Sequence, residues 1–257
     1  MRRREFIAFV CSTVAAWPLA ARAQQTDQVR RVGVLMNVAP EHPEGQPFVA
    51  AFRQALQRLG WTEGRNIRID IRWGENDVER DRKYAAELVA LTPDVVLAAG
   101  TLSVTALQRV SRTLPIVFVD VSDPVGAGLV ERMDRPGGST TGFMIFEYSL
   151  SAKWIELLKQ VAPNVRRAAV IRNAANPAGI AQFGAIRTTA SSLGVDVSPI
   201  DIRDAGDIEH AIAELARSPN AGLVVTSSAA VSAHIDQIIT LRGGTSCRQS
   251  TPIVLSL

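Results

Sequence analysis

The chain has 257 residues, of which 47% are hydrophobic and 21% charged, so it can bury a substantial core in one or two domains. Its formal net charge is +3, and Arg2, Arg3 and Arg4 alone supply that much. The remainder is close to neutral and has no basic stripe, which excludes nucleic acid as a partner. Cys11 and Cys247 are the two cysteines, and the first falls in an N-terminal segment that we expect to be removed, so no internal disulfide is expected.

The N-terminus has the pattern of a signal peptide. Basic residues at 2–4 precede an apolar stretch over 6–19, and Ala21-Arg22-Ala23 is the small-x-small pattern that signal peptidase accepts. We therefore expect cleavage after Ala23 and a periplasmic product. Arg3-Arg4-Glu5-Phe6 matches the core of a twin-arginine signal, and an ordinary secretory signal is the alternative. A membrane anchor is disfavoured because Trp17-Pro18 interrupts a run already shorter than the roughly 20 residues that a spanning helix needs.

From Arg31 onwards, short β-branched runs alternate with segments of helical period, which is typical of parallel sheets covered on both faces by helices. The first strand is predicted over 32–36, and the next helix begins near Pro47 and ends before Gly60. That helix places six apolar side chains on one face: Phe48, Ala51, Phe52, Ala55, Leu56 and Leu59. Further strands are predicted over 67–71, 95–99 and 116–121, separated by helices over 78–91 and 102–112.

A second, similar half follows a glycine-rich segment over 135–142, which predicts a turn near a crossover between lobes; an ordinary surface loop is the alternative. A helix is predicted over 149–161, and strands over 168–172, 195–200 and 222–226. The runs 32–37 and 97–101 resemble 168–173 and 223–227. We therefore predict an α/β fold of two Rossmann-like lobes with parallel sheets, over 31–140 and 141–257.

The sequence lacks the motifs that would indicate catalysis. The loop after the first strand has no G-x-G-x-x-G, and neither a phosphate-binding loop nor a G-x-S-x-G elbow occurs. His42, His210 and His234 have no partner at metal-ligand spacing. We predict no catalytic residue, no metal and no cofactor. His210 is expected on a solvated helix face, whereas His42 lies in the first strand-to-helix loop and could line a cleft.

Ligands of open α/β sheets bind beyond the carboxyl ends of the strands, so two facing lobes would form a cleft there. Short polar side chains and helix N-termini at these ends suit a carboxylate, and Asp120 or Asp123 could pair with an ammonium group. The candidate ligand-binding residues are Asn37, Thr101, Ser103, Asp120, Ser122, Phe146, Asn173, Asn176 and Ser227. The alternatives are helix capping or turn formation for the polar residues and a core role for Phe146.

Several of these segments together resemble the ABC transporter substrate-binding proteins of the tryptophan/tyrosine type. The resemblance runs from Met1 to about Leu241 and rests on the leader, on Pro115-Ile116-Val117-Phe118-Val119, on Arg135-Pro136-Gly137-Gly138 and on Asn173-Ala174-Ala175-Asn176-Pro177. It implies a type I periplasmic binding fold, capture of a small polar or aromatic solute, and docking on an inner-membrane ABC permease. It implies no catalysis, and we expect a monomer.

The resemblance stops near Leu241, and the segment from about 242 has an aberrant composition. Codons can be chosen for this segment that, when read in a frame shifted by two nucleotides, encode a sequence similar to the family's continuation. This predicts a frameshift and a truncated, incomplete second lobe. The alternative is that 251–257 is a genuine final strand, since Pro252-Ile253-Val254-Leu255 resembles Pro115-Ile116-Val117-Phe118. Two other functions stay open on the sequence: an exported hydrolase-like enzyme and a ligand-binding sensory partner.

Overall fold

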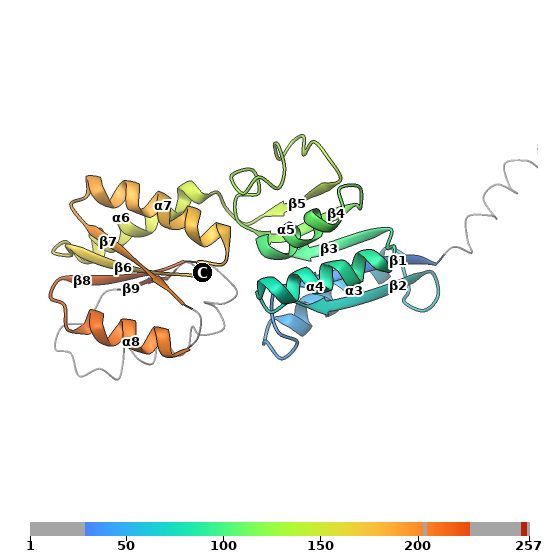
Figure 1. Ribbon diagram of the computed structural model, residues 1–257, viewed down its shortest axis with the longest axis horizontal. Helices are drawn as coiled ribbons and strands as arrows, with labels where there is room; N and C mark the ends of the chain where they lie inside the picture. Colours follow the sequence, from blue (N-terminus) through green and yellow to red (C-terminus); the bar gives the residue numbers. More distant parts are fainter. Residues whose placement is uncertain (1–28, 203–204, 227–252, 256–257) are drawn as a thin grey trace, which may run out of the picture.

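The computed structural model describes residues 29–202, 205–226 and 253–255, which form two α/β lobes lying side by side (Figure 1). The leader with its expected cleavage after Ala23, the candidate Ser227 and the tail over 242–252 lie outside the described residues. No helix in the described ranges is long and apolar enough to span a membrane.

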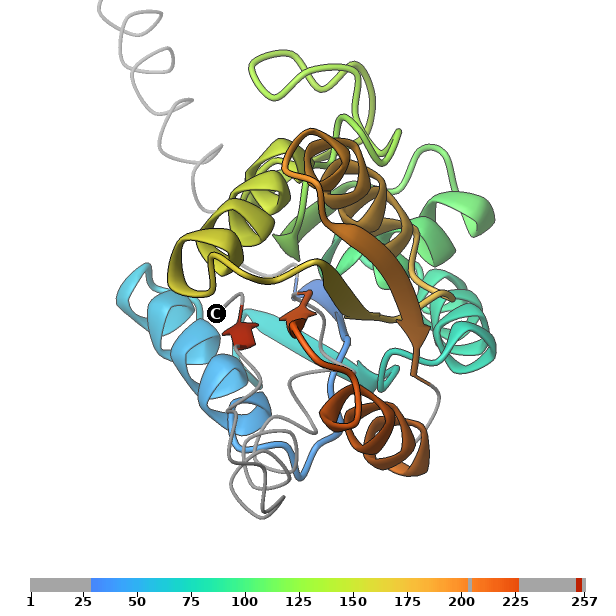
Figure 2. The same ribbon diagram turned by 90° about the vertical axis from the view of Figure 1, so that its left-hand side faces the viewer.

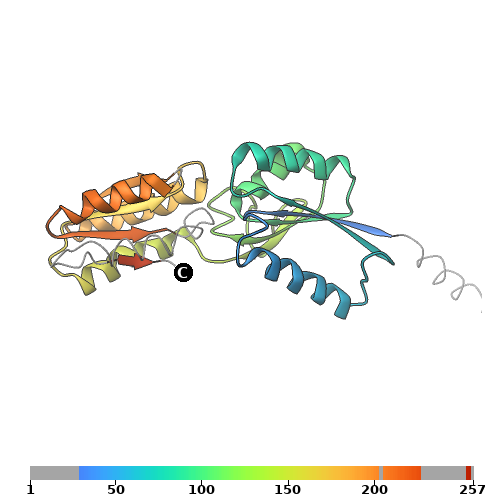
Figure 3. The ribbon, with the colours of Figure 1, turned by 90° about the horizontal axis from the view of Figure 1, so that it is seen from below.

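The N-terminal lobe is built on a parallel sheet of strand order β2-β1-β3-β4-β5. Its strands are β1 (Arg30–Met36), β2 (Ile67–Trp73), β3 (Val95–Ala99), β4 (Ile116–Val121) and β5 (Thr140–Met144). Helix α3 (Gly45–Arg58) covers one face, and helices α4 (Val78–Ala90) and α5 (Thr101–Val110) cover the other (Figure 3). Successive residues of β1 point to opposite faces, so Val34 packs toward α3 and Leu35 toward α4 and α5.

The C-terminal lobe has a parallel sheet of strand order β7-β6-β8-β9. Its strands are β6 (Arg167–Arg172), β7 (Asp196–Asp201), β8 (Ala221–Val225) and β9 (Ile253–Leu255). A short 3-10 helix η1 (Tyr148–Leu150) leads into α6 (Ser151–Val161), which lies with α7 (Pro177–Ser192) on one face, while α8 (Ala205–Ala216) lies on the other (Figure 2).

The two sheets share one topology, which confirms the predicted α/β fold of two similar lobes. Strand β1 lies between β2 and β3, just as β6 lies between β7 and β8, and β9 occupies the place that β4 has in the first sheet. Residues 253–255 pair in parallel with β8 as a strand. Most of the other predicted elements agree with the observed bounds to within a residue or two.

The glycine-rich segment 135–142 is only in part the turn that the sequence predicts. Thr140, Thr141 and Gly142 begin strand β5, which pairs in parallel with β4, so the N-terminal lobe extends past residue 140. A Cβ on Gly142 would lie 2.1 Å from the carbonyl oxygen of Phe118. The prediction was wrong here because this glycine permits close packing of two strands, whereas Gly137, with φ +81°, does serve the turn.

Helix α3 is amphipathic as predicted, but its apolar face is not wholly buried. Val49 is 3% exposed, while Phe48 is 53% and Leu59 is 75% exposed. Phe48 belongs to the first turn and overhangs the cavity described below, and Leu59 follows the last turn. The sequence pattern locates the stripe correctly, but the sheet beneath it covers only the middle of the helix.

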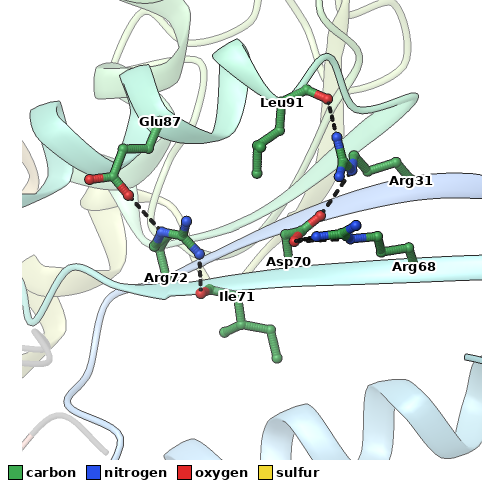
Figure 4. A network of polar contacts seen from close by, with 7 residues as sticks. All are labelled: Arg31, Arg68, Asp70, Ile71, Arg72, Glu87 and Leu91. Carbon is green, nitrogen blue, oxygen red and sulfur yellow. Dashed lines mark hydrogen bonds and ion pairs between the residues drawn. The ribbon is translucent and has the colours of Figure 1, made fainter. Parts of the chain in front are cut away.

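Strand β2, at the edge of the N-terminal sheet, is held by charged side chains (Figure 4). The Arg31 Nε lies 3.0 Å from an Asp70 carboxylate oxygen, and the Arg72 Nε lies 2.8 Å from Glu87 on α4. Charged residues at an edge strand discourage pairing with another chain. The first ion pair ties β2 to β1, and the second ties it to α4. Because they are partly exposed, each contributes little to stability by itself.

Candidate functional site

A cavity of about 550 Å³ opens at the carboxyl ends of β1, β3 and β4 and reaches the start of α7 in the other lobe. The chain leaves β1 toward β2 on one side and returns to β3 on the other, so β1 and β3 form a topological switch point, where ligands of such sheets bind. The candidates in its lining are Asn37, Thr101, Asp120, Ser122 and Asn176.

Asn37 and Asp120 form a direct pair in this cavity. The Asn37 Nδ2 donates a hydrogen bond of 2.7 Å to one carboxylate oxygen of Asp120. Asn37 is 6% exposed, so its amide is held by its surroundings, whereas Asp120 is open to the cavity. Although water reaches Asp120 from the cavity, the protein atoms crowded around it desolvate the carboxylate and raise its pKa; the Asn37 hydrogen bond opposes this, and the charge of Glu44 adds to it.

The backbone at Asp120 turns its side chain out of the sheet. Its φ is +55°, and the β4–β5 register shifts between Phe118 and Val121, which marks a bulge around Asp120. A bulge redirects a side chain, and aspartate tolerates left-handed backbone better than most residues. The strain at this position is typical of functional sites.

Gly100 makes room for the Asn37 amide. Its φ is +80°, and a Cβ there would lie 2.8 Å from the Asn37 Nδ2. Glycine is the residue that both adopts this backbone readily and leaves the amide in place. Gly100 is also the N-cap of α5 and makes no side-chain cap, so the first amide groups of that helix, next to Thr101, border the cavity.

Ser103, another candidate, lies beneath the cavity instead of in its lining. It is fully buried, and its hydroxyl donates a 3.1 Å hydrogen bond to the carboxylate of Asp81 on α4. Burial raises the pKa of Asp81 to about 6, with the Ser103 hydrogen bond opposing and the nearby Asp77 adding to the rise. Ser103 and Asp81 thus join α4 to the first turn of α5, which carries Thr101.

The two described polar candidates of the C-terminal lobe, Asn173 and Asn176, accept hydrogen bonds from nearby backbone amides. The Asn176 Oδ1 accepts a 3.0 Å hydrogen bond from the Ala178 amide and caps α7, although Asn176 also borders the cavity. The Asn173 Oδ1 accepts one of 2.9 Å from the Ala175 amide. These bonds match the capping and turn alternatives considered for both residues.

Phe146 also lies away from the cavity lining. Its ring meets that of Trp154 edge to face, with centroids 5.6 Å apart, and it packs against the core of the C-terminal lobe. Asp123 is likewise engaged: its carboxylate accepts hydrogen bonds from the Gly126 and Tyr148 amides at 2.7 and 3.2 Å. Asp123 thereby fastens the segment through which the chain passes from one lobe to the other.

Sequence reasoning missed the apolar wall of the cavity. Side chains from α3, from the α3-facing side of the sheet and from the residue after β5 form it: Phe48, Val49, Phe52, Leu97, Val119 and Ile145. The available signal was the alternation along β3 and β4, but whether such residues are covered by a helix is decided by tertiary packing. Glu44 and Asn76 were missed as well, whereas His42 borders the cavity as considered.

The charges around the cavity are uneven. Glu44 and Asp120 both line it, and among its described lining residues none is Lys or Arg. Arg172, at the end of β6, is turned away: its Nε lies 2.6 Å from Asp201, and its guanidinium lies 4.8 Å from the Phe183 ring centroid. In the part of the chain that the structure describes, no group of three or more His, Cys, Asp or Glu side chains could hold a metal ion.

Two α/β lobes with a polar and apolar cavity at their strand ends define the fold of a type I periplasmic binding protein. Residues 31–244 match the model of the ABC transporter substrate-binding protein family. This chain belongs to that family. Proteins of the family are typically exported and periplasmic, bind small-molecule solutes and work with ABC permeases.

Individual relatives agree with this membership. The chain is 27% identical over 215 residues to a tyrosine-binding protein of Clostridioides difficile, a match that covers 81% of this chain and 62% of that protein. An ABC domain from Streptococcus pneumoniae, solved in complex with L-Trp, has a TM-score of 0.74 at 21% identity, over 89% of this chain and 74% of that one.

A third relative is the ligand-free, open form of a substrate-binding protein with adhesive properties from Clostridium difficile. It has a TM-score of 0.56 at 26% identity, over 88% of this chain and 74% of that one. The present chain thus spans less than two thirds of the curated tyrosine-binding relative and about three quarters of the two solved structures.

Proposed function

We propose that this chain is the solute-binding component of an ABC uptake transporter and captures a small polar or aromatic solute, in particular an amino acid, between its lobes. The observation that carries the proposal is the cavity of about 550 Å³, to which both lobes contribute. This volume lies within the range of small-molecule sites, and its mixture of an apolar wall with a few polar groups is typical of them.

The arrangement of the groups suits an amino acid. Side chains such as Phe48, Phe52 and Leu97 offer apolar surface for a side chain, and Asp120 offers an anion. The N-terminus of α5 at Gly100 and Thr101 carries amides without an acceptor in the helix, and the helix dipole favours a negative group there. The tyrosine-binding relative and the L-Trp complex of the solved neighbour support the same class of ligand.

The same geometry supports binding without catalysis. His42 is the histidine that borders the cavity, and its Nδ1 accepts a hydrogen bond of 3.3 Å from the Glu44 amide. Its orientation is thus set by the local backbone. His210 lies on the exposed face of α8, 3.4 Å from Glu214. A hydrolase would need a nucleophile held by a general base within hydrogen-bond reach of a substrate.

A thermal-shift screen of amino acids, aromatic acids and small amides tests the proposal. A solute at about 100 times its dissociation constant adds roughly 2.7 kcal/mol to the free energy of unfolding and raises Tm. We expect at least one amino acid to do so. Turnover of a chromogenic ester, with no stabilisation by any solute, would favour the hydrolase instead, and a ligand response that depends on a membrane receptor would favour the sensory partner.

We further propose that the chain is exported through its N-terminal segment, cleaved after Ala23, and acts as a monomer with an inner-membrane ABC permease. The basic residues 2–4 and the small residues before Gln24 support this. Replacing both Arg3 and Arg4 by Lys tests the route, since the twin-arginine pathway reads the arginine pair. Loss of the periplasmic product supports that pathway, and unchanged export supports the ordinary secretory one.

A further inference from the structure

Two aspartates lie at the carboxyl end of β4, Asp120 within the strand and Asp123 just after it, and they have different roles. Both carboxylate oxygens of Asp123 accept backbone hydrogen bonds, from Gly126 and Tyr148, so Asp123 is part of the turn. The hydrogen bond recorded for Asp120 comes from Asn37, a side chain that is itself buried. The carboxylate of Asp120 therefore lies open to the cavity, while that of Asp123 is used by the fold.

The backbone fixes Asp120 in this position at an energetic cost. Its positive φ, the bulge in β4 and the absence of a Cβ at Gly100 all serve the Asn37–Asp120 pair. Since the Asn37 amide donates to the Asp120 Oδ2, the side chain is oriented before any ligand arrives. Preorganisation of this kind lowers the cost of binding, because the group is not immobilised by the ligand.

The charge near Asp120 is uncompensated. Glu44 also lines the cavity, no Lys or Arg occurs among the described lining residues, and no described cationic side chain lies within 4.0 Å of the Asp120 carboxylate. The protein atoms around Asp120 raise the pKa of its carboxyl even though the Asn37 hydrogen bond opposes this, so the protein compensates the charge only in part. A cationic group on a ligand would supply that compensation through a charge-assisted hydrogen bond.

We propose that Asp120, held by Asn37, is the specificity-determining residue of the site and selects ligands that carry a protonated amino group. Resting on the proposed function, this assignment narrows the solute to an amine-bearing compound with an apolar side chain. Acids of the same shape without the amine are rejected, because no ammonium group would then balance the charges of Asp120 and Glu44, and the ligand would cover Asp120 without giving it a partner.

The test measures affinities of the full chain by titration calorimetry for matched ligands. The first two probes are L-tryptophan and L-tyrosine. Indolepropionate and hydroxyphenylpropionate are their counterparts without the amine. Tryptamine and tyramine are their counterparts without the carboxylate. Removing one partner of a desolvated charge pair weakens binding by about 30-fold or more. We expect that loss on removal of the amine.

Asp120→Asn keeps the size of the side chain and removes its charge. We expect it to weaken binding of the amino acids by about 30-fold or more and to leave the deaminated acids unchanged or improved, so that selectivity for the amine falls to within about threefold. A merely structural role for Asp120 would weaken all probes alike. Asp120→Glu, which retains the charge, should keep the preference for the amine even if affinity falls.

The control is Asp134→Asn, a carboxylate on an exposed loop, where it pairs with Arg132. It should leave every affinity unchanged. Thermal melts of each variant report whether the fold is retained. If Asp120→Asn does not fold, Asp120→Glu and the ligand series on the natural protein still decide whether Asp120 selects the amine. Equal or tighter binding of a deaminated acid by the natural protein overturns the role of Asp120 while the solute-binding function stands. Binding of none of the probes, together with no stabilisation by any solute in the thermal-shift screen, contradicts both.

Discussion

The two lobes repeat one strand order but use the polar residues at their strand ends in different ways. In the N-terminal lobe, Asn37 and Asp120 are joined by a hydrogen bond in the lining of the cavity. In the C-terminal lobe, Asn173 and Asn176 accept from nearby backbone amides, and Thr226, which is 1% exposed, donates to the Ile171 carbonyl at 2.9 Å. A shared fold therefore does not imply equal shares in recognition.

This difference suggests a division of labour. Among the described lining residues, the N-terminal lobe supplies the oriented carboxylate of Asp120, the start of α5 and the apolar wall. The C-terminal lobe contributes the capped start of α7, at Asn176 and Ala178, as the opposite side. Closing of such lobes by hinge motion would then bury a ligand that the N-terminal lobe has already oriented.

The largest effect is expected from Gly100→Ala, which removes the space that the Asn37 amide occupies. The left-handed backbone costs alanine about 1–2 kcal/mol, and the overlap with Asn37 adds about 1–3 kcal/mol. Urea unfolding should show the full loss, and calorimetry with L-tryptophan or L-tyrosine should show affinity reduced by more than about tenfold.

Gly128→Ala is the matched control, because Gly128 has φ +70° but no atom lies within 4 Å of the place that a Cβ would take there. It should lose the backbone contribution alone, about 1–2 kcal/mol, and bind normally. Equal losses of stability and affinity in the two variants would show that Gly100 does not act through Asn37. The proposed difference between the two lobes would then not hold.

A smaller effect is expected at Asp81, a buried carboxylate. The described part of the C-terminal lobe has no buried carboxylate corresponding to it. Its pKa is about 6 in the folded protein and 3.8 in the absence of the fold, so the folded state holds the proton more tightly between these values. The free energy of unfolding therefore falls as the pH rises through this window, and the penalty is complete above it.

Asp81→Asn should remove that pH dependence. The substitution should therefore change the free energy of unfolding more favourably near pH 8 than near pH 4, by about 2–3 kcal/mol. Urea unfolding at both pH values measures the difference. Asp196→Asn, at an exposed position of β7, is the control and should show no comparable change. An identical pH dependence in Asp81→Asn and the natural protein would contradict the raised pKa of Asp81.

Gln182 in α7 tests the C-terminal lobe. It is fully buried, and among the residues that the structure describes neither its Nε2 nor its Oε1 has a hydrogen-bond partner. Replacing an unsatisfied amide by an apolar side chain of similar volume should stabilise the protein, so Gln182→Met is expected to raise the free energy of unfolding by about 1 kcal/mol. The exposed Gln160→Met should be neutral. A clear destabilisation at Gln182 alone would indicate that buried water satisfies the amide.

The smallest effect separates capping from recognition at Asn176. Loss of its side-chain cap should reduce the free energy of unfolding by about 1 kcal/mol in Asn176→Ala, and the affinity for L-tryptophan or L-tyrosine should change by less than about threefold. Asn37→Ala should show the opposite pattern, with a larger loss of affinity. If Asn176→Ala weakens binding as much as Asn37→Ala, the two lobes share recognition equally.

The sequence by itself predicted most of the elements, the two similar lobes and the edge of each sheet at which ligands of such folds bind. Alternation at periods of 2 and 3.6 is local and strong, and the carboxyl ends of parallel strands follow from the strand order. Asn37, Thr101 and Asp120 could therefore be named as polar strand ends without coordinates. Strand β5 escaped prediction because its glycine also fits a turn.

Tertiary structure decided which polar ends face the cavity. The type of a residue does not reveal whether its nearest partner is a ligand, its own backbone or a side chain from another element. Ser103 donates a hydrogen bond to Asp81, 22 residues away in the chain, and Asn37 donates one to Asp120, 83 residues away. The bulge at Asp120 and the incomplete cover over β3 and β4 arise from packing between distant segments, which local sequence patterns do not encode.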